Sequence, residues 1–290
     1  MAELLTGVLA GMLFGLLTVA VRRGLIRVPD AVAGSMVITS TAALIVLGLT
    51  IATGVGGDLL DVRTGLVYAA IGVVVPGISQ ILFVVSVREV GASRAAIMIG
   101  TAPLLATIIA VGFRGEPLKA GLIAGTVLIV VGGASLAWER NLPAGFRARG
   151  MLFAFACAML FALRDNAVRV TAGSTDMDPR AGTAWALIGA ASAVAVYAIG
   201  TRRSGLPQQV RAAFRPFLVP GVALGLGYTA LVLALHVGRV TVIAPLNATQ
   251  SLWAVLLAWL LLGKSDSVGP RVVMAGLLVV SGGILIGVFR

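Results

Sequence analysis

The chain has 290 residues, of which 59% are hydrophobic and only 11% are charged. A soluble domain carries roughly 25% charged residues, so this composition excludes a soluble globular protein, and its apolar character also excludes a disordered one. A single cysteine, Cys157, excludes a disulfide scaffold. The net charge is +11. Because the basic residues lie between long apolar runs, we interpret them as a membrane-orientation signal rather than a nucleic-acid surface.

Long apolar runs fill the chain from end to end. A transmembrane helix needs about 20 mostly apolar residues, because the hydrocarbon core is about 30 Å thick. Each span must satisfy its own backbone hydrogen bonds, so the sequence predicts an all-α membrane protein. Ten spans are predicted, at residues 4–21, 31–51, 65–87, 95–113, 120–138, 151–168, 181–200, 217–237, 240–262 and 272–289. The first lacks the basic start and cleavage site of a signal peptide, so we expect it in the mature protein.

Glycines and prolines within the spans predict how the helices pack and bend. Gly7, Gly11 and Gly15 recur four residues apart in the first span, and this spacing lets helix backbones approach closely. A proline inside a span removes a backbone donor and marks a candidate hinge. The candidate hinges are Pro76, Pro103 and Pro245. The longest connection between spans runs over residues 201–216.

The chain resembles itself at an offset of 147 residues. Residues 12–22 and 159–169 share seven identities in eleven positions, and Val90-Gly91 returns as Val237-Gly238. We therefore expect two five-helix repeats, residues 1–149 and 150–290. An odd number of spans in each repeat implies that the second crosses the membrane with inverted topology. Secondary transporters are built in this way, with a substrate site in a central cavity between the repeats.

Several motifs resemble the EamA repeat of the drug/metabolite transporter superfamily. They are Val90-Gly91-Ala92-Ser93-Arg94-Ala95-Ala96, Pro103-Leu104 and Gly115-Glu116-Pro117-Leu118, with looser copies at residues 237–239, 244–246 and 263–264. The resemblance covers the whole chain and implies ten helices, alternating access, and export of amino acids, drugs or other metabolites across the bacterial inner membrane. Within the superfamily the chain looks like a YddG-like amino-acid exporter. Residues 99–102 lack aromatic side chains, which argues against a specifically aromatic substrate.

Asp165 is the one acidic residue well inside a predicted span, and it lies between Arg164 and Asn166. Ionisable residues within a membrane are costly and are functional candidates by default. We predict that Arg164 and Asn166 contact a carboxylate or another polar group of the substrate, with Asp165 ordering them. A guanidinium suits a carboxylate because it donates two parallel hydrogen bonds. In the alternative, Asp165 pairs with Arg169, four residues later, while Arg164 reaches the membrane interface.

Other polar and aromatic residues within the spans form a second set of candidate substrate-binding residues. A buried amide must find a partner on another helix or on a ligand, so hydrogen bonds between helices are the alternative. For tryptophan the alternative is packing against lipid or protein. This set consists of Gln80, Thr101, Trp185, Tyr228, Asn247 and Gln250.

Motifs that the sequence lacks restrict the function. No phosphate-binding loop is present, so ATP does not drive transport directly. One histidine, one cysteine and no carboxylate cluster argue against an enzyme, and we expect no cofactor, metal or nucleic-acid partner. The predicted function is a secondary transporter that exports small polar metabolites, with amino acids favoured. The alternatives are a drug, nucleotide-sugar or sugar-conjugate transporter of the same architecture, and a passive channel. Uniport, exchange and proton coupling stay open, as does the oligomeric state, for which a monomer suffices.

Two arguments about orientation disagree. The odd-numbered connections carry fourteen of the 22 basic residues. Basic residues concentrate on the cytoplasmic side, so this count predicts that both termini lie in the periplasm. The family resemblance implies the reverse, with both termini in the cytoplasm.

Overall fold

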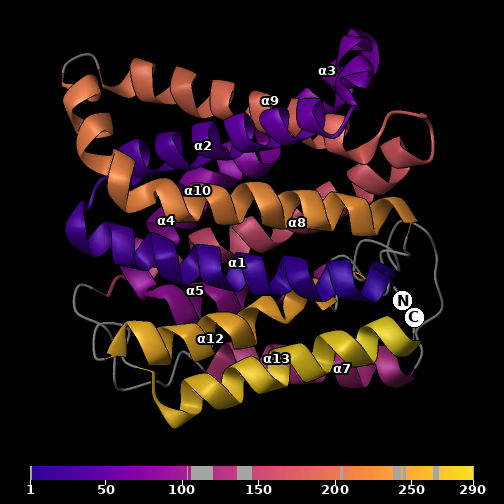
Figure 1. Cartoon of the computed structure of the whole chain (residues 1–290). Coiled ribbons are helices and arrows are strands. Elements are labelled where there is room, and N and C mark those ends of the chain that lie inside the picture. Colours follow the sequence, from indigo (N-terminus) through magenta and orange to yellow (C-terminus); the bar gives the residue numbers. More distant parts are fainter. Residues whose placement is uncertain are drawn as a thin grey trace.

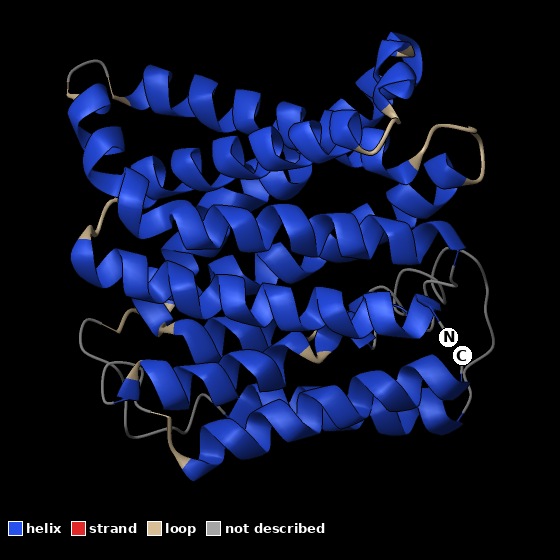
Figure 2. Cartoon of the chain, viewed as in Figure 1, coloured by secondary structure: helices blue, strands red, loops and turns tan. Residues whose placement is uncertain are grey.

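The computed structural model describes residues 2–102, 104–105, 120–135, 146–202, 205–237, 243, 246–263 and 268–289. Within these residues every regular element is a helix and none is a strand, as the composition predicted. Figure 2 shows the helices gathered in one bundle, with the N- and C-termini close together at one end of it. The candidate hinges Pro103 and Pro245 and the motif at residues 115–118 lie outside the described residues.

The described helices overlap the predicted spans, with differences at several ends, and residues 106–113 of the fourth predicted span lie outside the described residues. The first half contains α1 (Ala2–Arg27), α2 (Ala31–Ala52), η1 (Gly56–Leu60), α3 (Val62–Gly72), η2 (Val73–Ile78), α4 (Ser79–Val90), α5 (Ala92–Ile99) and α7 (Ala120–Ser135). The second half contains α8 (Arg149–Ala172), α9 (Pro179–Thr201), α10 (Leu206–Val237), α12 (Gln250–Leu261) and α13 (Pro270–Phe289). Aspartates cap three of them: Asp30 accepts hydrogen bonds from the first amides of α2, Asp61 accepts one at α3, and Asp178 accepts one at α9.

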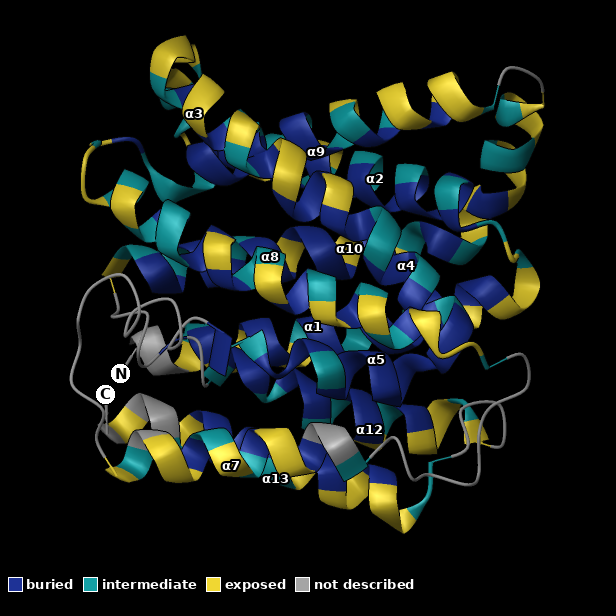
Figure 3. Ribbon diagram, turned by 180° about the vertical axis from the view of Figure 1, so that it is seen from behind, coloured by how far each residue is buried: buried dark blue, intermediate teal, exposed yellow. Residues whose placement is uncertain are grey.

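Six helical segments are long and apolar enough to cross a membrane. They are Leu5–Arg27, Ala31–Ala52, Val62–Val90, Arg149–Ala172, Pro179–Thr201 and Leu206–Val237. Three shorter apolar helices accompany them, at Ile123–Gly132, Leu246–Leu261 and Pro270–Leu285. The chain is therefore an integral membrane protein. Figure 3 shows exposed residues along the outer helices α7 and α13, and these include apolar side chains such as Val127 and Leu277, which suit contact with lipid tails.

One predicted connection is wrong. Residues 206–216 do not belong to a connection, because α10 begins at Leu206 and continues through Pro216 and Pro220. Figure 1 shows this helix bent near its start, as prolines inside a helix would cause. The third predicted span lies within one apolar segment, Val62–Val90, which bends next to the candidate hinge Pro76. It is broken between α3 and α4 by η2, where Val75 has the extended dihedral angles φ −140° and ψ 114°.

Helices of the two halves pack against each other instead of forming two separate bundles. α1 contacts α10 and α12 of the second half, and α8 contacts α4 and α5 of the first (Figure 1). α2 packs on α9, and α7 packs on α13. The α1–α12 contact is close because Gly11 faces Thr249 and Gly15 faces Trp253, which confirms the packing role predicted for this glycine spacing. The buried centre of the molecule is thus bordered by both halves.

The same hydrogen bond occurs once in each half. Near the end of α1, Nη1 of Arg22 donates to the carbonyl oxygen of Arg88 at 3.1 Å. Near the end of α8, Nη1 of Arg169 donates to the carbonyl oxygen of Leu235 at 3.2 Å. Both residues of the second pair lie 147 positions after their counterparts in the first. The offset found in the sequence therefore relates contacts as well as residue types.

Candidate functional site

A small cavity lies at the centre of the bundle, bordered by helices of both halves. Its volume is about 20 Å³, which is room for about one water molecule. The lining residues are Phe14, Leu17, Thr18, Pro76, Ser79, Gln80, Phe83, Phe161, Arg164, Leu224, Tyr228 and Gln250. Arg164, Gln80, Tyr228, Gln250 and the candidate hinge Pro76 were singled out from the sequence, and the fold brings these five together.

Arg164 and Asp165 form an ion pair within the protein interior. Both residues are buried, with 5% and 4% of their surfaces exposed. Nε of Arg164 donates to Oδ1 of Asp165 at 2.9 Å, and Nη2 approaches the same oxygen at 2.8 Å. The alternative pairing of Asp165 with Arg169 is wrong, because the Arg169 guanidinium instead donates to the carbonyl oxygens of Leu235 and His236. Arg164 is therefore a charge-compensated guanidinium on the cavity wall and does not reach the membrane interface.

Two aromatic rings fix the position of the Arg164 guanidinium. Its central carbon lies 4.8 Å from the centre of the Phe161 ring and 5.5 Å from that of Tyr228. A cation is attracted to ring faces at such distances, and the attraction is stronger away from water. The Tyr228 hydroxyl donates in turn to the carbonyl oxygen of Val75 at 3.2 Å. This carbonyl is available because the helix is broken at Val75, and the hydroxyl supplies the partner that the break removes.

Gln80 contributes a second hydrogen-bond donor to the cavity. Its side chain is buried, and Nε2 has no hydrogen-bond partner among the residues that the structure describes. An unsatisfied buried donor costs about 1–3 kcal/mol, so its presence beside a cavity indicates a group that a ligand would satisfy. The cavity hydroxyls of Thr18 and Ser79 donate to backbone carbonyls and so leave only their oxygens to accept. The polar part of the wall therefore offers donors on Arg164 and Gln80, and acceptors on the hydroxyl oxygens of Thr18 and Ser79.

Four candidates from the sequence do not line the cavity in this conformation. Asn166 donates to the Ala162 carbonyl of its own helix at 2.8 Å. The Thr101 hydroxyl donates to the Met98 carbonyl at 2.7 Å. Trp185 lies on α9 with its ring against Gly65 of α3, and Asn247 is buried just before α12, close to α1.

Tyr228 was identified from the sequence, but the phenylalanines of the cavity wall were missed. Phe14 and Phe161 both line the cavity and are equivalent positions of the repeat, 147 residues apart. Leu17 and Arg164 are related by the same offset and also line it. Projecting the repeat from Arg164 onto the first half would have found these residues. The comparison also shows that one half supplies a charge where the other supplies a leucine, so the wall is asymmetric.

Comparison with known proteins agrees with this architecture. The model of the EamA-like transporter family matches the chain twice, over residues 1–137 and 148–288. A protein of known crystal structure is similar in fold over 98% of this chain and 95% of its own, with a TM-score of 0.68 and 19% sequence identity. No curated protein matches the sequence. The two family matches together span nearly the whole chain, which therefore belongs to the EamA-like transporter family of the drug/metabolite transporter superfamily, whose members are membrane transporters and not enzymes.

Proposed function

We propose that this protein is a secondary transporter that exports small polar metabolites, with amino acids as the first substrate class, across the bacterial inner membrane. The observation that supports this is Arg164, a guanidinium held on the wall of a cavity that both halves border. A guanidinium binds a carboxylate with charge-assisted hydrogen bonds, and these are stronger in a site that excludes water. Gln80 adds a donor whose hydrogen bond is not yet made.

The proposed substrate site consists of Arg164, Gln80, Tyr228 and Gln250, with Asp165 positioning the guanidinium. The substrate carboxylate would accept hydrogen bonds from Arg164 and Gln80. Four further candidates, Asn166, Asn247, Trp185 and Thr101, would reach the substrate only after the helices move. A cavity with room for about one water cannot hold an amino acid, so transport requires such movement.

Alternating access between two inverted repeats, residues 1–149 and 150–290, is the proposed mechanism. One contact between equivalent helices supports it: Gly132 of α7 faces the carbonyl of Ala275 on α13, and Gly282 of α13 faces the carbonyl of Gly125 on α7. Exchanging the halves at an offset of 150 residues turns the first contact into the second. This is the relationship expected of repeats related by a two-fold axis in the membrane plane. The helix break at Pro76, beside the cavity, is the proposed hinge.

Transport by purified protein in liposomes tests the proposal. Liposomes loaded with unlabelled substrate are supplied with a panel of radiolabelled amino acids, with sugar conjugates and cationic drugs as the competing classes. We expect saturable counterflow of at least one amino acid, as for a YddG-like exporter. Counterflow restricted to a sugar conjugate or a drug would support the alternative transporter classes. If no amino acid is transported and none competes, the amino-acid proposal is refuted. Flux that shows neither saturation nor counterflow would indicate a channel.

A further inference from the structure

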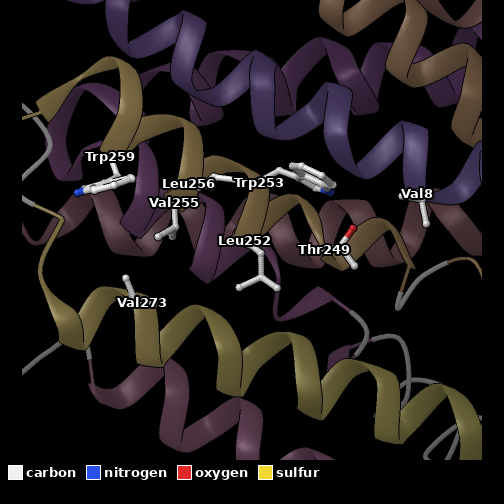
Figure 4. Close-up of a pocket in the computed structure, with 8 residues that line it drawn as sticks. All are labelled: Val8, Thr249, Leu252, Trp253, Val255, Leu256, Trp259 and Val273. Carbon is white, nitrogen blue, oxygen red and sulfur yellow. The ribbon is translucent and has the colours of Figure 1, made fainter.

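A second hollow lies away from the central cavity, in a groove between α1, α12 and α13 (Figure 4). We call it the α12 groove, and its volume is about 520 Å³. The residues that line it are Val8, Thr249, Leu252, Trp253, Val255, Leu256, Trp259 and Val273. Its one hydroxyl, on Thr249, already donates to the Leu246 carbonyl at 2.6 Å. The wall is otherwise apolar, so the groove suits a hydrocarbon chain.

The length of the α12 groove matches one leaflet of a bilayer. Its lining extends along α12 from Thr249 to Trp259, and ten residues of helix rise about 15 Å. Half of a hydrocarbon core about 30 Å thick is the same length. The inner end is level with the central cavity, because Thr249 directly precedes the cavity residue Gln250. The other end is at Trp259, which is 63% exposed and close to the end of α12.

The Trp259 end of the groove lies at the basic face of the protein. α1 runs parallel to α12, since Gly11 faces Thr249 and Gly15 faces Trp253. The end of α1, with the exposed Arg23 and Arg27, is therefore on the Trp259 side. α13 begins there too, with the groove residue Val273 in its first turn, whereas Arg271 faces a separate hollow beside Ser135 of α7. Basic side chains at this depth attract the phosphates of anionic lipids.

We propose that the α12 groove binds one acyl chain of an anionic phospholipid, whose phosphate lies between Arg23 and Arg27. The apolar wall holds the chain, its length fits a single leaflet, and the arginines select the charge of the headgroup. This lipid site is separate from the substrate cavity, because Gln250 contacts the cavity while its neighbour Thr249 contacts the groove. The proposal therefore does not depend on the identity of the transported substrate.

Tryptophan fluorescence provides a direct test, because Trp253 and Trp259 both line the groove. Purified full-length protein is placed in vesicles containing increasing fractions of phosphatidylglycerol or phosphatidylcholine with brominated acyl chains, which quench tryptophan on contact. The Trp253→Phe, Trp259→Phe double variant measures the background from the other tryptophans. We expect half-maximal quenching of the groove tryptophans at an about fivefold lower fraction of the anionic lipid for each arginine that contacts its phosphate.

Matched variants separate a bound lipid from ordinary surrounding lipid. Val273→Phe should fill the groove and remove the preference, whereas Leu44→Phe, on an exposed position of α2, should keep it. Arg23→Gln combined with Arg27→Gln should lower the preference for phosphatidylglycerol, while Arg211→Gln, an exposed arginine of α10, should leave it unchanged. If Val273→Phe fails to fold, the arginine-to-glutamine variants still test the lipid preference. Equal quenching by the two lipids in the wild type, or an unchanged preference in both test variants, would overturn the proposal.

Discussion

Arg164 pairs with Asp165, its immediate neighbour in the sequence, with both Nε and Nη2 directed at Oδ1. Adjacent residues on a helix point in different directions, so the long arginine side chain must curl back to make this pair. Phe161, one turn earlier on α8, and Tyr228 of α10 hold it in that position. Because both charges belong to one helix, the ion pair can move with α8 as a unit. The charge of the site then stays compensated in any conformation that α8 adopts.

Removing one partner of this pair should affect stability and transport differently from removing both. Arg164→Ala leaves a buried carboxylate uncompensated, and we expect a loss of about 3–5 kcal/mol in the free energy of unfolding. The Arg164→Ala, Asp165→Ala double variant should recover most of that loss, because no buried charge is left. Transport should be abolished in both. Thermal unfolding in detergent and liposome uptake measure the two effects, with the exposed Arg211→Ala as the control. A double variant that transports normally would remove Arg164 from the substrate site.

Gln80 should contribute to the affinity for substrate and not to the stability of the fold. Gln80→Leu removes a buried donor that has no partner among the described residues, so the unfolding temperature should be unchanged or higher. The same variant should bind substrate more weakly, because it loses one hydrogen bond to the carboxylate. Thr39→Val is the comparison, since this buried hydroxyl donates to the Ser35 carbonyl of its own helix and Thr39 does not line the cavity. Substrate competition curves for the two variants check the difference. Equal effects on binding would contradict the assignment of Gln80.

Tyr228 has two separable roles, one for the hydroxyl and one for the ring. Tyr228→Phe leaves the Val75 carbonyl without its donor and should cost about 1–3 kcal/mol of stability. The ring remains, so the Arg164 contact and transport should persist. Tyr228→Leu should lose transport as well, because the guanidinium then lacks one of its supporting rings. Unfolding and uptake assays distinguish the two, with the exposed Tyr197→Phe as the control. Transport lost already in Tyr228→Phe would place the hydroxyl on the substrate.

The carboxyl group of Asp178, in the connection between α8 and α9, should make the stability of the protein depend on pH. The hydrogen bond from the Arg180 side chain at 2.9 Å lowers the pKa of Asp178 and outweighs partial burial, which raises it. Because the folded pKa lies below the unfolded value of about 3.9, the stabilisation is complete above that value and is lost as the pH falls through the folded pKa. The unfolding temperature should therefore fall from pH 6 to pH 3. Asp178→Asn should show a smaller fall, and an identical fall would count against this contribution.

The sequence could predict what depends on local composition. Runs of about 20 apolar residues identify spans wherever they occur, because a bilayer imposes the same length on each. The boundaries were less certain: the span predicted to begin at residue 217, directly after Pro216, in fact begins at Leu206 and continues through Pro216 and Pro220. Their effect is a bend, because neighbouring helices can satisfy the backbone groups that a proline frees.

Part of the candidate site could be predicted from the sequence for a similar reason. By itself the sequence established a membrane protein that consists of two repeats. It also identified Arg164 and Asp165 as candidates, because a charge inside an apolar run can be recognised without a structure. Only the tertiary structure decided the partners. In the structure Asp165 forms its ion pair with Arg164 and not with Arg169, and Asn166 lies outside the cavity. Helix periodicity determines which residues share a face of a helix. The rotation of each helix and its crossing angles determine which residues of other helices that face contacts. That choice is made by contacts between the halves, and no single segment of the chain encodes it.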